Sequence, residues 1–245
     1  DTVLSRGLGD VYKRQLPEGS SGYDLAKDIG PGLAKSAVAV SVDGVQRDLH
    51  DVIEGDASVS IITIDSDEGI EIMRHTLTAQ VLARAIKNLY PNSKLAIGPT
   101  IDDGFYYDVE SEKSISSDDL SNIEDEMKKI IKTKSSITKK LVSKSEALKI
   151  FKENKESYKE IIVNESKQKD NFQLYYQDDK KFVDLCRGPH LPNLEFIGSF
   201  KLTKVSGAYW KGDSANAMLT RIYGTAFNNE KDLQSHLDNL EEALK

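Results

Sequence analysis

A short acidic segment at residues 65–69 divides this 245-residue chain into two parts with different hydrophobic patterns. Before it, residues 16–64 contain one short helical stripe among segments that alternate apolar and polar side chains, which is the period of a strand. After it, residues 70–89 carry apolar side chains at helical spacing, and the elements that follow show no βαβ alternation. The sequence therefore predicts two α+β units joined by a linker.

The first unit is predicted to be a partial β-grasp fold over residues 16–64. A short helix is expected at residues 23–29, and Asp43-Gly44 is typical of a two-residue hairpin turn. Strands are expected at residues 37–42, 45–49 and 57–64. Residues 1–15 follow neither period, so we expect them to be disordered or artefactual and to lie outside the fold.

The second unit is predicted to be an α+β domain over residues 70–228 that begins with the long helix at residues 70–89. A final helix is expected at residues 229–245, where Asn229 is a suitable N-cap and leucines recur at helical spacing. No C-cap follows before the last residue. We therefore expect the chain to be a fragment of a longer protein.

The composition narrows the class of protein. No apolar run approaches the roughly 18 residues of a membrane span, so we expect a cytoplasmic protein with no membrane partner. A net charge of −7 argues against a broad phosphate-binding surface. Residues 128–159, however, hold eleven lysines and three glutamates. This stretch predicts either solvated helix faces or a local surface for a polyanion.

The densest polar cluster of the sequence is Asp184-Leu-Cys186-Arg-Gly-Pro-His190. Its C-x-x-x-H spacing allows a thiolate and an imidazole to point into one site, where they could bind zinc or position a water and move its proton. The alternative is a buried cysteine beside a hydrogen-bonded histidine. Because Cys186 is the only cysteine, an intrachain disulfide and a four-cysteine zinc site are excluded.

Three further histidines need a separate interpretation. His75 lies near the start of the long helix, and on a regular helix Gln80 would sit about 140° around the axis from it. His75 and Gln80 would then occupy different faces, whereas Thr76 and Gln80 would share one. Glutamine is a poor zinc ligand, so these residues alone do not predict a metal site. His50 and His236 have no polar partner motif and are expected at the surface.

Six segments together are more specific than any of these motifs alone. They are residues Asp28–Lys35, Ile97–Asp108, Ser157–Lys159, Asp184–His190, Gly207–Asp213 and Arg221–Phe227. In this order, over about residues 16–245, they resemble the N-terminal part of bacterial threonyl-tRNA synthetases. The resemblance implies a TGS domain without its first hairpin at residues 16–64 and a tRNA editing domain of the threonyl/alanyl type at residues 70–228. It also implies that residues 229–245 lead into an aminoacylation core that the chain lacks.

The resemblance implies a function as well. The editing domain would hydrolyse seryl-tRNA made in error on threonine tRNA, because a binding pocket rejects the smaller serine poorly. The partners would be the acceptor end of threonine tRNA and the missing core, with a homodimer only in the full-length protein. No cofactor is expected here, since ATP and zinc belong to the missing core, and ligase activity would need that core.

The resemblance also assigns site residues. Cys186 and His190 match the family motif directly, and Lys159, Asp184 and Tyr107 would line the same pocket. His190 would orient or deprotonate a water, Lys159 would bind sugar hydroxyls or stabilise negative charge, and Cys186 would contact the seryl group. No metal is expected at this cluster in the threonyl branch, although the alanyl branch holds zinc there.

One motif departs from the family pattern. Where the family usually reads Arg-His-Ser-x-Ala-His, residues Arg74–Gln80 are one residue longer and end in glutamine. We expect His75 to be catalytic, and Thr76 and Gln80 to bind substrate together with Tyr107. Gln80 cannot act as a base, so we predict weakened editing. The alternatives are a non-catalytic module that binds the tRNA acceptor end and a zinc-dependent hydrolase of the alanyl type.

Overall fold

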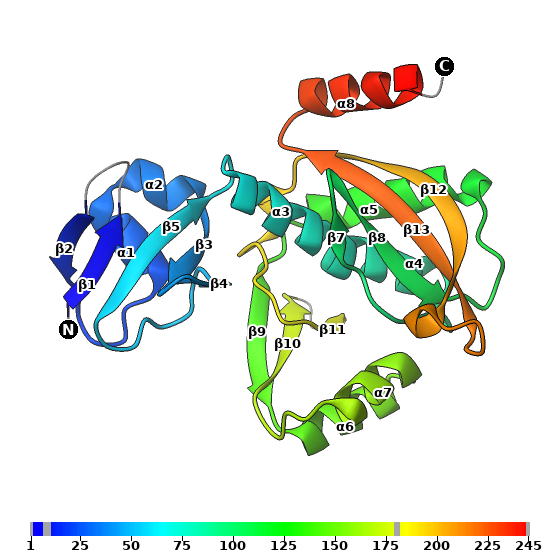
Figure 1. Ribbon diagram of the computed structural model, residues 1–245, viewed down its shortest axis with the longest axis horizontal. Helices are drawn as coiled ribbons and strands as arrows, with labels where there is room; N and C mark the ends of the chain where they lie inside the picture. Colours follow the sequence, from blue (N-terminus) through cyan, green and yellow to red (C-terminus); the bar gives the residue numbers. More distant parts are fainter. Residues whose placement is uncertain (1, 7–10, 179–181, 244–245) are drawn as a thin grey trace.

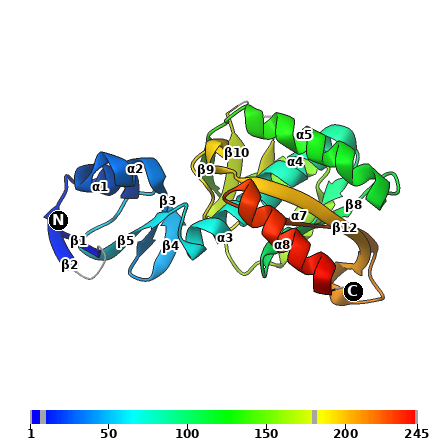
Figure 2. The ribbon, with the colours of Figure 1, turned by 90° about the horizontal axis from the view of Figure 1, so that it is seen from above.

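The computed structural model describes residues 2–6, 11–178 and 182–243 and shows two α+β units followed by one helix (Figure 1). The first unit contains β1 (Thr2–Arg6), β2 (Val11–Gln15), α1 (Gly22–Ile29), α2 (Pro31–Ser36), β3 (Ala37–Val42), β4 (Val45–Asp48) and β5 (Ala57–Thr63). Its strands form one mixed sheet in the order β2-β1-β5-β3-β4. The sheet ends at β4 on the side that faces the second unit (Figures 1 and 2).

Local sequence signals explain most of this unit. Ser21 and Asp24 form a reciprocal capping box at the start of α1, which satisfies two backbone donors of the first turn. Asp43 and Gly44 both adopt positive φ, as the predicted hairpin turn between β3 and β4 requires. The buried face of α1, represented by Leu25, packs against the sheet and closes a small core.

The prediction that residues 1–15 lie outside the fold, and that the first hairpin is missing, is contradicted by the structure. β1 pairs antiparallel with β2 and parallel with β5, so it lies inside the sheet. β2 is an edge strand that contains Lys13 and Arg14, and Arg14 forms an ion pair of 2.6 Å with Asp28 of α1. Charged edge strands lack the apolar alternation by which strands are recognised.

The second unit is built around one long helix made of α3 (Asp67–Thr76), the π-helical turn η1 (Leu77–Leu82) and α4 (Ala83–Leu89). The acidic residues that predicted a linker form the first turn of this helix. Ser66 caps α3 by accepting a hydrogen bond from the Gly69 N–H, and Asp67 and Glu68 sit where the helix dipole favours negative charge. The linker is therefore shorter than residues 65–69.

The remaining elements form two sheets and the helices that cover them. They are β6 (Lys94–Leu95), β7 (Thr100–Ile101), β8 (Gly104–Glu110), η2 (Ser117–Asp119), α5 (Leu120–Lys132), β9 (Ile137–Val142), α6 (Lys144–Glu153), α7 (Ser157–Glu165), β10 (Phe172–Gln177), β11 (Val183–Leu185), η3 (Leu194–Phe196), β12 (Ser199–Tyr209), η4 (Trp210–Gly212), β13 (Met218–Phe227) and α8 (Glu230–Ala243). The larger sheet has the order β12-β13-β8-β6, with β7 paired to β8, and the smaller has the order β11-β10-β9. The predicted α+β class is confirmed.

The main core surrounds the long helix. Leu77, Leu82 and Ile86 are fully buried there together with Phe105 of the larger sheet and Tyr175 of the smaller one. The helix thus holds the two sheets of the second unit in fixed positions on its surface.

The π-helical turn explains how the longer histidine motif fits into the helix. A π-helix closes i→i+5 hydrogen bonds and so holds one more residue per turn than an α-helix. The Ala83 N–H donates to the Thr78 carbonyl, and all residues of Leu77–Leu82 are buried. The extra residue is therefore absorbed inside the helix, after His75, rather than before it.

The final helix α8 lies beside β12 and β13 (Figure 2). Asn229 accepts a hydrogen bond from the Asp232 N–H, as expected of the predicted cap. Of the leucine stripe, Leu233 is buried and Leu240 is exposed, and His236 packs against the Phe227 ring. No helix in the described part of the chain is long and apolar enough to cross a membrane.

About half of the lysines in residues 128–159 pair with carboxylates of the protein. Six of the eleven lysines lie within ion-pair distance of a carboxylate: Lys128, Lys129, Lys134, Lys139, Lys140 and Lys159. This pairing favours the interpretation as solvated faces and internal ion pairs over a continuous polyanion surface.

Candidate functional site

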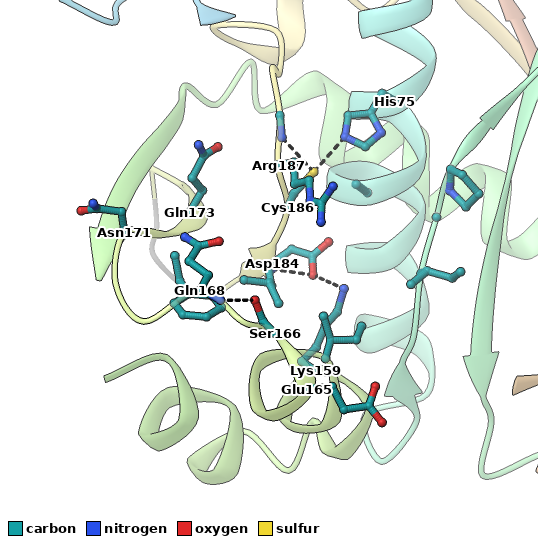
Figure 3. Close-up of a pocket in the computed structure, with 18 of the residues that line it drawn as sticks. His75, Lys159, Glu165, Ser166, Gln168, Asn171, Gln173, Asp184, Cys186 and Arg187 are labelled. Carbon is teal, nitrogen blue, oxygen red and sulfur yellow. Dashed lines mark hydrogen bonds and ion pairs between the residues drawn. The ribbon is translucent and has the colours of Figure 1, made fainter. Parts of the chain in front are cut away.

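A cavity of about 730 Å³ opens between the long helix, α7 and the loop that follows β11 (Figure 3). His75 and Ala79 enter from the helix, Lys159 from α7, and Asp184 and Cys186 from β11 and its loop. The remaining polar lining comes from Glu165, Ser166, Lys167, Gln168, Asn171, Gln173 and Arg187. His75, Lys159, Asp184 and Cys186 form one wall of the cavity, which we call the titratable wall.

A buried ion pair lies at the base of the titratable wall. Lys159 Nζ is 2.6 Å from Asp184 Oδ1, and the two side chains are only 4% and 3% exposed. Burial raises the pKa of the Asp184 carboxyl, and the lysine and the Leu185 N–H oppose that rise. The ammonium is held on the cavity wall by this carboxylate, where it can face an anion or a developing negative charge.

Above this pair, His75 and Cys186 contact each other directly. His75 Nε2 lies 2.8 Å from Cys186 Sγ. Burial, with the nearby Asp184 as a second cause, raises the pKa of the Cys186 thiol to about 12. Burial and the charge of Lys159 lower the pKa of His75 to about 4. At neutral pH the thiol is protonated and unsuited to nucleophilic attack, while the imidazole is neutral and can accept a proton.

His190 lies behind His75 rather than on the cavity wall. Its ring stacks on that of His75, with centroids 4.6 Å apart and planes within 3°. The Thr76 hydroxyl is 3.0 Å from His190 Nδ1, whereas His190 Nε2 is buried without a hydrogen-bond partner among the described residues. Burial lowers the pKa of His190 well below its ordinary value, so this ring is neutral too.

Thr76, Gln80 and Tyr107, the residues predicted to bind substrate, do not line the cavity. All three are fully buried. The Thr76 hydroxyl accepts from the Leu191 N–H at 3.0 Å, and the Gln80 carbonyl and amide oxygens accept from Gln177. The π-helical turn directs residue 80 toward Gln177 instead of the cavity.

Tyr107 supports the cavity from beneath. Lys159 Nζ lies 5.8 Å from the centroid of the Tyr107 ring, which adds a cation–π contact to the ammonium. The ring also packs so closely against Gly98 that a Cβ at that position would overlap it. Gly98 is therefore the residue that lets the cavity-lining loop lie directly on the aromatic ring.

Sequence reasoning missed several residues of the site. Arg187 and Gln173 line the cavity, and Tyr175 packs edge-on against His190 with ring centroids 4.5 Å apart. Arg187 lies inside the recognised polar cluster, so proximity in sequence was an available signal. Gln173 and Tyr175 belong to β10, whose alternation predicts a strand but does not predict which face lies at the site.

The three side chains His75, Cys186 and His190 also form a potential metal-binding group. One ligand atom from each lies within 4.8 Å of the others. Two imidazole nitrogens and one sulfur with a remaining open position are a donor set that suits catalytic zinc. The expectation that this cluster works without a metal stays a prediction.

Gly188 provides a test of how tightly the loop after β11 is packed. We expect Gly188→Ala to lower the free energy of unfolding by about 2–4 kcal/mol, because φ is +65° and a Cβ would overlap the Tyr175 hydroxyl. Gly55→Ala is the matched control, since its φ is +64° and nothing lies within 4 Å of the added atom. Backbone strain alone should cost about 1–2 kcal/mol there. Equal losses in urea denaturation would contradict the close contact.

Comparisons with known proteins match parts of both units. Residues 8–63 match the TGS domain, and residues 173–223 match the domain described as "Threonyl and Alanyl tRNA synthetase second additional domain". The threonine–tRNA ligase of Hahella chejuensis is 47% identical over 238 residues, which are 97% of this chain and 37% of that protein. The TGS match begins inside the segment predicted to lie outside the fold. The chain corresponds to the N-terminal region of the threonyl-tRNA synthetases, with a TGS domain followed by their second additional domain.

Proposed function

We propose that the cavity of the second additional domain hydrolyses seryl-tRNA that carries serine on threonine tRNA. The observation that supports this most directly is the combination, on one cavity wall, of a neutral imidazole at His75 and a buried ammonium at Lys159. A neutral imidazole can take a proton from water, and a fixed cation can stabilise the oxyanion of an ester under attack. A separate hydrolytic site is needed because serine is small enough to enter a pocket built for threonine.

The proposed reaction assigns one role to each side chain. A water attacks the carbonyl carbon of the ester while His75 accepts its proton, and the ribose oxygen leaves and takes that proton back. Lys159, held by Asp184, stabilises the negative charge on the carbonyl oxygen or contacts the ribose hydroxyls. Cys186 remains a thiol and contacts the seryl group. Relative to the sequence prediction, proton transfer moves from His190 to His75, because His190 lies one layer behind.

The partner of this reaction is the acceptor end of threonine tRNA. Arg187 and Lys167 place cationic side chains on the lining of the cavity, where they can meet the phosphates of a tRNA terminus. The chain spans 37% of the ligase it matches, and the aminoacylation core of such a protein is its second inferred partner. ATP, zinc and dimerisation are proposed to belong to that core.

Single-turnover hydrolysis tests the proposal. Seryl-tRNA of the threonine type is mixed with excess chain, and ester loss is compared with the spontaneous rate and with threonyl-tRNA. Hydrolysis of the seryl ester well above the spontaneous rate, with the threonyl ester spared, is expected. Binding of both tRNAs without any acceleration would instead identify a non-catalytic module for the acceptor end.

Zinc-dependent hydrolysis is the second candidate, favoured by the ligand geometry of His75, Cys186 and His190. The two mechanisms differ in their response to a chelator. Under the first proposal, dialysis against a strong chelator leaves the hydrolysis rate unchanged. Loss of activity that returns with one equivalent of zinc would select the second.

The extra residue in the helix predicts that hydrolysis is slower than a second imidazole would allow. We expect deletion of Thr78 combined with Gln80→His to restore α-helical spacing, bring a histidine to the face of His75 and raise the rate about tenfold or more. Gln80→His alone should give no gain, because residue 80 faces Gln177. Single-turnover rates of both variants check this, with circular dichroism to confirm folding. Equal rates for the double variant and the unaltered chain would contradict the prediction.

A further inference from the structure

A carboxylate of the TGS domain reaches the back of the proposed hydrolytic site. Asp48 ends β4, the strand at the sheet edge that faces the second unit (Figure 1). Its Oδ1 accepts a hydrogen bond of 2.8 Å from the backbone N–H of His190, and its Oδ2 accepts one of 2.8 Å from the Tyr175 hydroxyl. Lys139 Nζ lies 3.2 Å from Oδ2. The Asp48 side chain is 15% exposed, so these contacts are made largely out of water.

These two hydrogen bonds fix the loop that carries Cys186. The backbone N–H of His190 is the end of that loop, and Asp48 anchors it to the other domain. The Tyr175 ring packs edge-on against the His190 ring, and its hydroxyl lies directly against Gly188. One carboxylate therefore holds both the main chain of the loop and the aromatic side chain on which the loop rests.

Few contacts separate Asp48 from the cavity. His190 stacks on His75, and Cys186 contacts His75 at 2.8 Å. A shift of the loop would move the thiol and the supporting imidazole together, away from the ring proposed to accept the proton. Misplacement of a reacting group by about 1 Å can cost on the order of 100-fold in rate.

We propose that Asp48 is a positioning residue for ester hydrolysis, so that the TGS domain completes the site of the second additional domain. The inference rests on the proposed function. It assigns to the TGS domain a task in hydrolysis that is distinct from any contact it makes with tRNA.

Asp51 supplies a matched control for simple domain docking. Its carboxylate forms an ion pair of 2.6 Å with Lys139, which also lies across the boundary between the domains. Among the described residues its carboxylate forms no hydrogen bond with the loop or with Tyr175. Asp51→Asn therefore weakens the docking of the two domains but leaves the hydrogen bonds of Asp48 in place.

The experiment compares Asp48→Ala, Asp48→Asn and Asp51→Asn in the whole chain, with seryl-tRNA of the threonine type as substrate. We expect Asp48→Ala to lower the maximal hydrolysis rate about 10- to 100-fold with little change in KM, because the group acts on geometry rather than on binding. Asp48→Asn should recover part of the rate, since its amide oxygen still accepts from the His190 N–H. Asp51→Asn should stay within about twofold of the unaltered chain, because Asp51 forms no hydrogen bond with the loop or with Tyr175 among the described residues.

Each other outcome overturns the inference. An unchanged rate in Asp48→Ala would show that the contact positions nothing. A loss in Asp51→Asn as large as in Asp48→Ala, or a rise in KM at constant maximal rate, would show domain docking or tRNA binding instead. If Asp48→Ala fails to fold, the isosteric Asp48→Asn carries the same comparison against Asp51→Asn. Absence of hydrolysis in the unaltered chain would refute the proposed function itself, and the role of Asp48 would fall with it.

Discussion

Lys159→Met is expected to lower the free energy of unfolding by about 3–5 kcal/mol and to abolish hydrolysis of seryl-tRNA. Lys159 and Asp184 are 2.6 Å apart and almost completely buried, so removal of the ammonium leaves a carboxylate in the interior without its counter-charge. The same substitution removes the cation proposed to stabilise the ester oxyanion. Urea denaturation measures the first effect, and single-turnover hydrolysis the second.

A double variant separates these two consequences. Lys159→Met with Asp184→Leu removes both charges and replaces them by apolar side chains of similar size, a change that is often neutral or stabilising for buried pairs. Stability should return to within about 2 kcal/mol of the unaltered chain, whereas hydrolysis should not return. Recovery of both would show that the ion pair is structural and that the proposed role of Lys159 is wrong.

The site residues that could be located from local sequence patterns lie close together in the chain. Asp184, Cys186 and His190 lie within seven consecutive residues, so their closeness in space could be expected from the sequence alone. Lys159 was assigned by resemblance alone, and the structure places it against Asp184. Spacing along the sequence does not show how deeply a side chain is buried. It therefore did not reveal that His75, rather than His190, faces the cavity.

The π-helical turn shows a different limit. On a regular helix His75 and Gln80 occupy different faces, and the alignment with the family motif placed Thr76 and Gln80 at its two histidine positions. The helix instead takes up the extra residue at Leu77–Leu82, because all six side chains are buried and a shift of register would break the core. The packing of side chains along the whole helix determines which residue lines the cavity. The spacing of apolar residues in the sequence does not show that packing.

Contacts between the domains were beyond the reach of local patterns. Asp48 and His190 are 142 positions apart, and nothing in the hairpin that ends at Asp48 predicts a partner in another unit. The acidic residues at positions 67 and 68 were misread for a related reason, since a polar run is typical both of a linker and of the first turn of a helix. The apolar stripe that begins at Ile70 was recognised, but not its cap at Ser66.

His75→Ala is expected to lower the hydrolysis rate about 100- to 10,000-fold, the usual contribution of a positioned general base. His50→Ala is the matched control, because His50 is exposed, packs against the Tyr23 ring and does not line the cavity. The pH dependence identifies the group more sharply. A base must be unprotonated, and burial with the charge of Lys159 lowers the pKa of His75 to about 4.

Hydrolysis by the unaltered chain should therefore stay constant as pH falls from 7 to about 5 and decline only as pH approaches 4. An exposed histidine with its ordinary pKa of about 6.5 would lose half of its activity well before that. Rates are measured from pH 7 to 4 after subtraction of the spontaneous reaction, with the fold monitored by circular dichroism. A midpoint near 6.5 would mean that the base is not the buried His75 ring, because burial and the charge of Lys159 lower the pKa of that ring.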